Sequence, residues 1–111
     1  MQYETIRIDC SNIFDEDSFH NVFAGTFGFP VFYGRNMDAW VDCMTSLDEP
    51  DDGMTTVTVE KGGIVVLQLD AIAQVRDRCR RAYDDLLECS AFVNWRRMQS
   101  GLKPVLCLSF A

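Results

Sequence analysis

Residues 64–69 place the strongest constraint on what this 111-residue chain can fold into. Their sequence, Ile-Val-Val-Leu-Gln-Leu, is apolar at both alternating sets of positions apart from Gln68. Such a run is typical of a strand that is covered on both faces, as in a parallel sheet. Parallel strands need long crossover connections, which are usually helices. The run therefore predicts an α/β domain in which strands and helices alternate.

Capping residues and apolar spacing predict the elements that precede this run. Asp and Asn are preferred helix N-caps, and Gly is preferred just after a helix ends. Alternation between polar and apolar residues indicates strands. The expected elements are a strand over residues 3–9, a helix from Asp15 or Asp17 to Gly25 or Gly28, a helix from Asn36 to about Leu47, and a short hairpin formed by residues 55–59 with a turn at Gly62-Gly63.

The segment after the run is expected to hold two helices and a last strand. Asp70 can cap a helical region that continues to Ser100, and this length exceeds one average helix. We therefore expect a break near residues 88–90, followed by a strand over residues 105–110. The elements thus point to a small α/β domain with a parallel core flanked by helices. The residues of the helical region expected to face inward are Ile72, Val75, Cys79, Tyr83, Leu86, Val93 and Trp95.

The excess negative charge lies in one segment. The chain holds 17 acidic and 10 basic residues, a net charge of −7, and residues 36–60 contain seven acids with no Lys or Arg. Direct nucleic-acid binding is disfavoured because it needs cations that neutralise phosphates. A basic protein partner is favoured because opposite potentials orient the encounter. For residues 48–52 alone, a solvated acidic loop kept for solubility is an equally good interpretation.

Several other classes of protein are disfavoured. No apolar run approaches the roughly 20 residues that cross a bilayer, and the first ten residues lack the pattern of a secretory signal. The five cysteines are odd in number and form no C-x-x-C pair, and His20 has no Cys or His at ligand spacing. We therefore expect one cytoplasmic domain over residues 1–111, without a metal, a cofactor or a disulfide framework.

The helix after Asn36 has two opposed stripes. Asp38 and Asp42 lie one turn apart on the outward stripe. Two like charges at this spacing slightly destabilise an isolated helix, which suggests that the pair is used in binding. The plain alternative is that they only keep one face hydrated. An enzymatic role is disfavoured because a convex helix face offers no cleft, nucleophile or oxyanion hole. The inward stripe is Met37, Trp40, Met44 and Leu47, and the outward stripe is Asp38, Asp42 and Thr45, with Val41 at the border.

The sequence around this helix resembles the hallmark of the barstar family of ribonuclease inhibitors. Residues 29–44 read FPVFYGRNMDAWVDCM, and the family hallmark reads P-x-(Y)-Y-G-x-N-x-D-A-x-x-D-C-L. The order of the expected elements is also that of the family's three-stranded parallel sheet. The matched positions include Tyr33, Gly34, Asn36, Asp38, Ala39, Asp42 and Cys43.

The resemblance implies a stoichiometric inhibitor and not a catalyst. In the family, the hallmark helix and the loop before it plug the active site of a small secreted or injected ribonuclease. Asp42 would enter the phosphate-binding pocket and Asp38 would pair with its cationic rim. We therefore expect an immunity protein that binds a basic nuclease and is a monomer before binding. The alternative is a barstar-like module that regulates another basic protein or an RNA-processing factor. The residues expected around the two carboxylates are Phe32, Tyr33, Asn36, Val41 and Thr45.

Three departures from the family leave the target open, including whether it is an RNase or a DNase. Phe32 replaces the first of the usual tyrosines and lacks its hydroxyl. Val41 stands where the best-known member has Trp. Arg96 falls, by a gapless count from the last strand, where that member has an interface Glu. A nuclease with an acidic rim facing Arg96 would fit better than the usual one.

Overall fold

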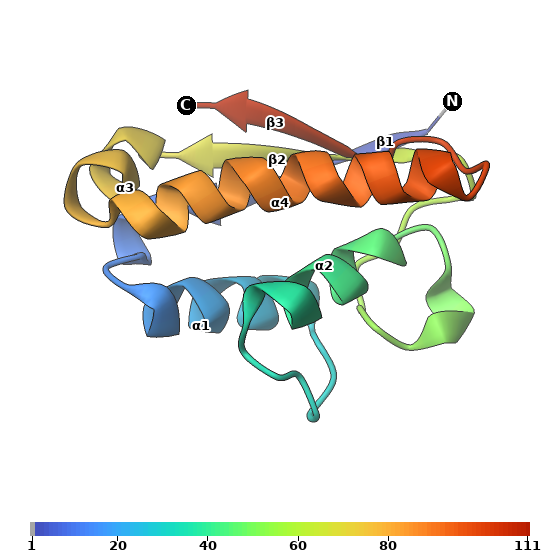
Figure 1. Ribbon diagram of the computed structural model, residues 1–111, viewed down its shortest axis with the longest axis horizontal. Coiled ribbons are helices and arrows are strands. Elements are labelled where there is room, and N and C mark those ends of the chain that lie inside the picture. The colour runs from blue at the N-terminus through green and yellow to red at the C-terminus, as the bar shows by residue number, and fades with distance from the viewer. Residues whose placement is uncertain (1) are drawn as a thin grey trace.

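The strand β2 (Ile64–Asp70) is the centre of a parallel sheet in the computed structural model, which describes residues 2–111 (Figure 1). On one side it pairs with β1 (Tyr3–Asp9) and on the other with β3 (Leu106–Phe110). The register places Tyr3 opposite Ile64 and Leu69 opposite Phe110. The predicted α/β fold with a three-stranded parallel sheet is therefore confirmed.

Helices form both crossover connections. Between β1 and β2 the chain passes through the 3₁₀ turn η1 (Cys10–Asn12), α1 (Glu16–Phe27), α2 (Met37–Thr45) and the 3₁₀ turn η2 (Pro50–Asp52). Between β2 and β3 it passes through α3 (Ile72–Arg78) and α4 (Arg80–Gln99). Figure 1 shows α1, α2 and α4 on the same side of the sheet, with α2 beneath α4.

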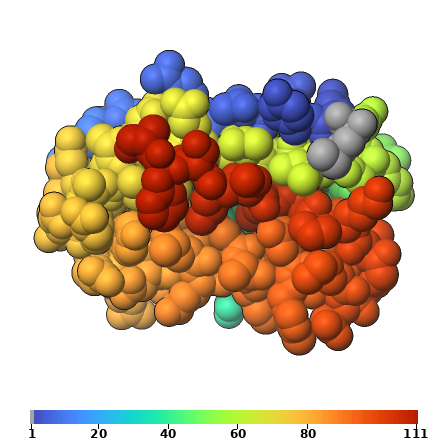
Figure 2. All heavy atoms as spheres, turned by 90° about the horizontal axis from the view of Figure 1, so that it is seen from above, coloured from blue at the N-terminus to red at the C-terminus, as the bar shows by residue number. Residues whose placement is uncertain are grey.

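The second face of the sheet is open to solvent, so the expectation that β2 is covered on both faces is wrong. Val65, Leu67 and Leu69 are fully buried, whereas the alternate residues of β2 are half-buried. Figure 2 looks onto this open face, where atoms of all three strands lie at the surface beside α4. The open face is stabilised by polar contacts, because Asp70 accepts hydrogen bonds from Gln68 (2.8 Å) and from Arg7 (3.0 Å).

The boundaries of α1 and the start of α2 follow from local chemistry, as predicted. Asp15 and Ser18 form a reciprocal capping box at the start of α1, and Gly28 ends that helix with φ at 64°. Asn36 caps α2, because its side-chain oxygen accepts a hydrogen bond of 2.8 Å from the Ala39 N–H. Both caps satisfy backbone donors that would otherwise lack a partner.

The helical region breaks at Cys79 and not near residues 88–90. The guanidinium of Arg78 donates hydrogen bonds to the carbonyls of Cys10, Ser11 and Ile13, at 3.3, 2.6 and 3.0 Å. These contacts fix the end of α3 against η1, and α4 begins afresh at Arg80. The predicted cap at Asp70 is also wrong, since Asp70 belongs to β2 and its carboxylate binds Arg7 and Gln68.

Trp95 was expected to face inward, and it is 53% exposed. The buried stripe of α4 contains Leu86, Ser90, Val93 and Arg97, which are spaced 4, 3 and 4 residues apart. Trp95 lies two residues, or about 200°, from both Val93 and Arg97. A polar pair of residues, Ser90 and Arg97, thus occupies the interior face and an aromatic residue lies outside.

The predicted hairpin is absent from the described part of the chain. Residues 55–59 form no strand, because their backbone donors are used elsewhere. The Thr56 N–H donates to the Phe27 carbonyl (2.8 Å), and the Val59 N–H donates to the Leu47 carbonyl (3.0 Å). This segment therefore ties the ends of α1 and α2 together.

A buried ion pair joins the end of α2 to the end of α4. Arg97 and Asp48 are only 1% and 4% exposed, and their side chains form two hydrogen bonds of 2.9 and 2.8 Å. Arg97 also donates to the carbonyls of Thr45 and Lys103, and Asp48 accepts from the Gly62 N–H. Burial acts to raise the pKa of Asp48, but the hydrogen bonds from Arg97 and Gly62 outweigh it and hold the pKa below its usual value. Asp48 therefore belongs to the interior and not to a solvated loop.

Removing one partner of this ion pair should destabilise the fold strongly. Arg97→Ala leaves the Asp48 carboxylate buried without its counter-charge, and we expect a loss of about 3–5 kcal/mol in the free energy of unfolding. Urea denaturation at neutral pH measures this loss. The control is Arg80→Ala, which removes an exposed pair with Asp84 and should cost less than about 1 kcal/mol. Equal losses in the two variants would contradict the structural role of Arg97.

Candidate functional site

The outward face of α2 presents two carboxylates on a rigid base. Trp40 and Met44 are fully buried, whereas Asp38 and Asp42 are exposed, which confirms the predicted division of the helix. The Trp40 ring packs edge-on against Phe23, with ring centroids 5.6 Å apart. Asp38 and Asp42 are four residues apart, which corresponds to a rise of about 6 Å along the helix. The buried face therefore fixes where the two carboxylates project.

The loop over residues 28–36 is anchored by Tyr33. The Tyr33 ring packs against Phe29 with centroids 4.7 Å apart, and its hydroxyl lies 2.5 Å from His20 Nδ1. Which of the two groups donates in this contact depends on which ring nitrogen of His20 carries the proton. Phe32, the neighbouring residue, is 73% exposed. Tyr33 thus holds the loop, and Phe32 projects from it.

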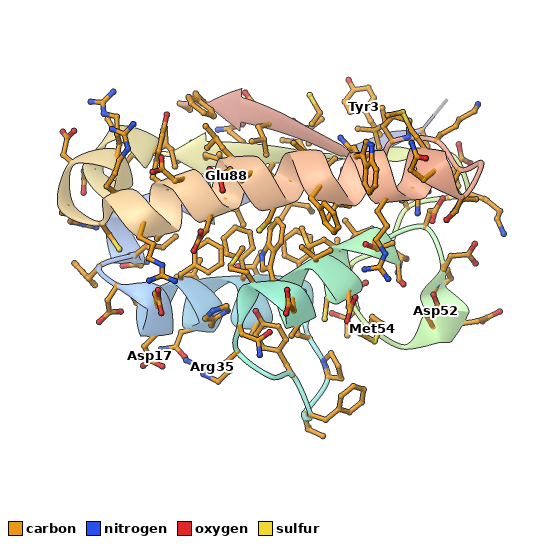
Figure 3. The ribbon with its side chains drawn as sticks, viewed as in Figure 1. Tyr3, Asp17, Arg35, Asp52, Met54 and Glu88 are labelled. Atoms are coloured by element: carbon orange, nitrogen blue, oxygen red, sulfur yellow. The ribbon has the colours of Figure 1, made fainter. Side chains whose placement is uncertain are left out.

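Arg35 gives the loop a second attachment. Its Nη2 donates to the carboxylate and to the backbone carbonyl of Asp17, at 2.5 and 3.0 Å, and Figure 3 shows the two side chains together. The φ of Arg35 is 54°, in the left-handed region. This turn brings the chain to Asn36 in the extended conformation of a helix N-cap. The loop and the start of α2 are therefore held by α1.

Arg96 of α4 pairs with Asp42, a contact that the sequence analysis missed. Arg96 Nη1 donates to Asp42 Oδ1 at 2.8 Å, and both side chains are about half exposed. An exposed pair of this kind contributes at most about 1 kcal/mol to stability. Asp38 forms no ion pair with another residue in the range 2–111. One of the two carboxylates is therefore neutralised within the chain and the other is free.

A shallow hollow separates α2 from α4 beside the carboxylates. Val41, at 5% exposed, forms part of its floor and offers a partner only an edge, so it is a core residue more than a contact residue. A second hollow continues past Thr45, whose hydroxyl donates to the Val41 carbonyl at 2.6 Å. The residues that line the first hollow are Asp38, Val41, Asp42, Cys89, Phe92 and Arg96, and those of the second are Asp42, Thr45, Ser46, Asp52, Met54 and Arg96.

Cys89 and Phe92 were also missed by the sequence analysis. Helical spacing could have indicated them, because Arg96 was already a candidate and Phe92 lies one turn before it on the same face. The spacing of Phe92 and Arg96 points to a binding surface only once the hollow between α2 and α4 is known. The proximity of α4 to α2 is a property of the tertiary structure.

A cavity of about 290 Å³ lies at the other end of Asp38, between the starts of α2 and α4 and the first turns of α1. Both carboxylates and guanidinium groups line this cavity, so it does not favour either an anionic or a cationic ligand. Asn36 lines it, but the Asn36 side-chain oxygen is already occupied by the helix cap. The residues that line it are Glu16, Phe19, His20, Arg35, Asn36, Met37, Asp38, Arg81, Ala82 and Asp85.

The chemistry of the site suits binding. All five cysteines are free thiols, and burial together with the charge of Asp42 raises the pKa of Cys43 to about 11, which keeps that thiol protonated. Among residues 2–111, no three His, Cys, Asp or Glu side chains converge as metal ligands. None of the helices in this range is long and apolar enough to span a membrane. What the site offers is two carboxylates on a rigid helix, one of them paired with Arg96, bordered by apolar surface.

The anchor of the loop should make stability depend on pH. Burial, followed by the nearby charge of Arg35, lowers the pKa of His20, while Glu16, Asp17 and Asp85 oppose part of this effect. The unfolded chain therefore binds a proton on this histidine first, at a pKa of about 6.5. Stability is fully present above that pH and is lost as the pH falls toward the lower pKa of the folded state.

We expect wild type to lose more unfolding free energy between pH 7.5 and pH 5 than His20→Gln, which cannot titrate there. Urea denaturation at several pH values measures this difference, and the variant corrects for the carboxylates that both proteins share. Identical pH profiles would show that His20 is not held neutral in the folded chain.

A family model described as Barstar (barnase inhibitor) matches residues 3–107, which include every helix and the first two strands. No curated protein matches the chain.

Proposed function

This chain belongs to the barstar family, and on that premise we propose that it is an immunity protein that plugs the active site of a ribonuclease or related nuclease toxin with α2. The family is one of ribonuclease inhibitors and not of enzymes. The observation that carries the proposal is the exposure of Asp38 and Asp42 on a helix whose opposite face is fixed in the core.

The two carboxylates can substitute for phosphate oxygens. A ribonuclease binds its substrate through cationic side chains that are arranged around a phosphodiester, and an inhibitor needs anions at the same positions. Because α2 is held by its cap and by Trp40, Asp38 and Asp42 lose little conformational freedom when they bind. In this proposal Asp42 enters the phosphate pocket and Asp38 pairs with the cationic rim.

The residues around the carboxylates have different tasks. Phe32 is the exposed apolar contact on the loop side. Tyr33 and Asn36 position the loop and the helix, because their polar groups are already engaged by His20 and by the Ala39 N–H. Val41 forms part of the floor of the first hollow and Thr45 lines the second. The binding energy is therefore expected to come chiefly from Asp42, Asp38 and Phe32.

Arg96 restricts which nuclease fits. Binding of Asp42 to a cationic pocket breaks the 2.8 Å contact with Arg96 and buries the guanidinium in the interface. An unpaired buried charge is costly, so the partner has to provide an acceptor for it. We propose a nuclease whose phosphate-binding cations lie next to a carboxylate. In this proposal the chain is a single domain. It is a monomer before it binds the nuclease, and it acts in the cytoplasm.

Asp42→Ala should abolish tight inhibition and leave the fold intact. In the complex, the variant strands the nuclease cations without an anion, and we expect inhibition to weaken at least about a hundredfold. Charge pairs across the barnase–barstar interface, from this same family, set that scale. The unfolding free energy should change by less than about 1 kcal/mol, because Ala favours the helix and the lost pair with Arg96 is exposed.

Titration of purified barnase, the enzyme named in the family description, measures the inhibition constant, and thermal melting measures the stability. Asp51→Ala is the matched control, because it removes an exposed acid of the same segment that lines neither hollow. Tight inhibition by Asp42→Ala would exclude Asp42 as the plug. Equal weakening by Asp51→Ala would show that only the overall charge matters.

A further inference from the structure

Two stacked aromatic side chains lie on the solvent side of α4. Phe92 and Trp95 are 47% and 53% exposed, with ring centroids 5.7 Å apart and planes inclined by 28°. Neither ring stacks on a third aromatic residue or a cation within residues 2–111. Two of the other exposed aromatics have an internal partner, since Phe14 lies under the Arg78 guanidinium and Phe110 contacts Tyr83. Exposed aromatic surface without an internal partner is typical of binding sites.

The aromatic pair is continuous with the anionic site. Phe92 lines the same hollow as Asp38, Asp42 and Arg96. Arg96 is one turn after Phe92 and holds Asp42 through its 2.8 Å contact. Trp95 extends this surface away from α2. Anions and flat apolar rings therefore adjoin each other on one side of the molecule.

This combination matches the chemistry of single-stranded RNA. Proteins hold such strands by cationic contacts to the phosphates and by stacking or apolar contacts to the flat faces of the bases. A ribonuclease site thus has a cationic subsite next to a base-binding subsite. The carboxylates of α2 suit the first, and the two rings of α4 suit the second.

We propose that Phe92 and Trp95 form an aromatic shelf that occupies the base-binding subsite of the nuclease whose phosphate subsite takes Asp42. The inference rests on the proposed function and extends the inhibitory surface from α2 to α4. It makes the chain a mimic of a phosphate together with its neighbouring base. The shelf is expected to behave as a hot spot, because aromatic side chains dominate such surfaces.

The first test compares variants in the titration of barnase. Trp95→Ala and Phe92→Ala should each weaken inhibition about tenfold or more, and Trp95→Phe should retain most of it because a ring still stacks. Met98→Ala is the matched control, since Met98 is similarly exposed on α4 but carries no aromatic ring, and it should change inhibition less than about threefold. Thermal melting checks that every variant is folded.

The second test asks whether the shelf lies in a base subsite. A free nucleoside should compete with wild type and raise its apparent inhibition constant, but it should not compete with the Phe92→Ala/Trp95→Ala double variant. Inorganic phosphate should compete with both proteins. Weakened variants with no competition from the nucleoside would overturn the base-subsite assignment.

A third readout uses the location of the two tryptophans. Trp40 is fully buried and Trp95 is half exposed, so acrylamide quenching in the free protein reports chiefly on Trp95. Binding of barnase should protect Trp95 from the quencher. Inhibition that is lost in Asp42→Ala but unchanged in Trp95→Ala and Phe92→Ala would overturn the shelf while leaving the proposed function standing. Failure of wild type to inhibit both barnase and a ribonuclease that carries a carboxylate beside its phosphate-binding cations would overturn both proposals.

Discussion

The burial of the inner face of α2 is the constraint on which the rest of the site depends. Trp40 is enclosed by the aromatic side chains of α1, and Asn36 closes the start of the helix. At the other end, the Asp48–Arg97 ion pair joins the segment after α2 to α4. One face and both ends are thus fixed, so Asp38 and Asp42 project in defined directions. A partner that binds them does not have to order the helix first.

Two consecutive arginines of α4, Arg96 and Arg97, form ion pairs with different roles. Arg97 is buried, uses its guanidinium on Asp48 and on two carbonyls, and holds elements together. Arg96 is rotated by about 100° on the same helix and reaches Asp42 at the surface. The first pair is costly to break, because removing either partner leaves the other charge buried without its counter-charge, whereas the second is exposed and weak enough for a partner to break. The same residue type therefore serves stability at one position and selectivity at the next.

What could be predicted from the sequence was the part governed by local chemistry. The caps at Asp15 and Asn36 and the opposed stripes of α2 depend on neighbours within one helical turn, and the structure bears them out. The break at Cys79 depends instead on Arg78 reaching carbonyls more than sixty residues earlier in the chain. The contact of Arg96 with Asp42, at a separation of 54 residues, has the same origin. Such contacts are set by tertiary packing, so the spacing of residues along the chain cannot predict them.

The most direct test of the central claim is a footprint of the bound nuclease on this chain. Hydrogen–deuterium exchange, or amide chemical shifts measured by NMR, should be compared with and without barnase. If α2 is the inhibitory element, the changes concentrate in residues 28–45 and in the C-terminal half of α4, and the open face of the sheet is unaffected. Changes centred on β1 and β3, with α2 unaltered, would contradict the central claim.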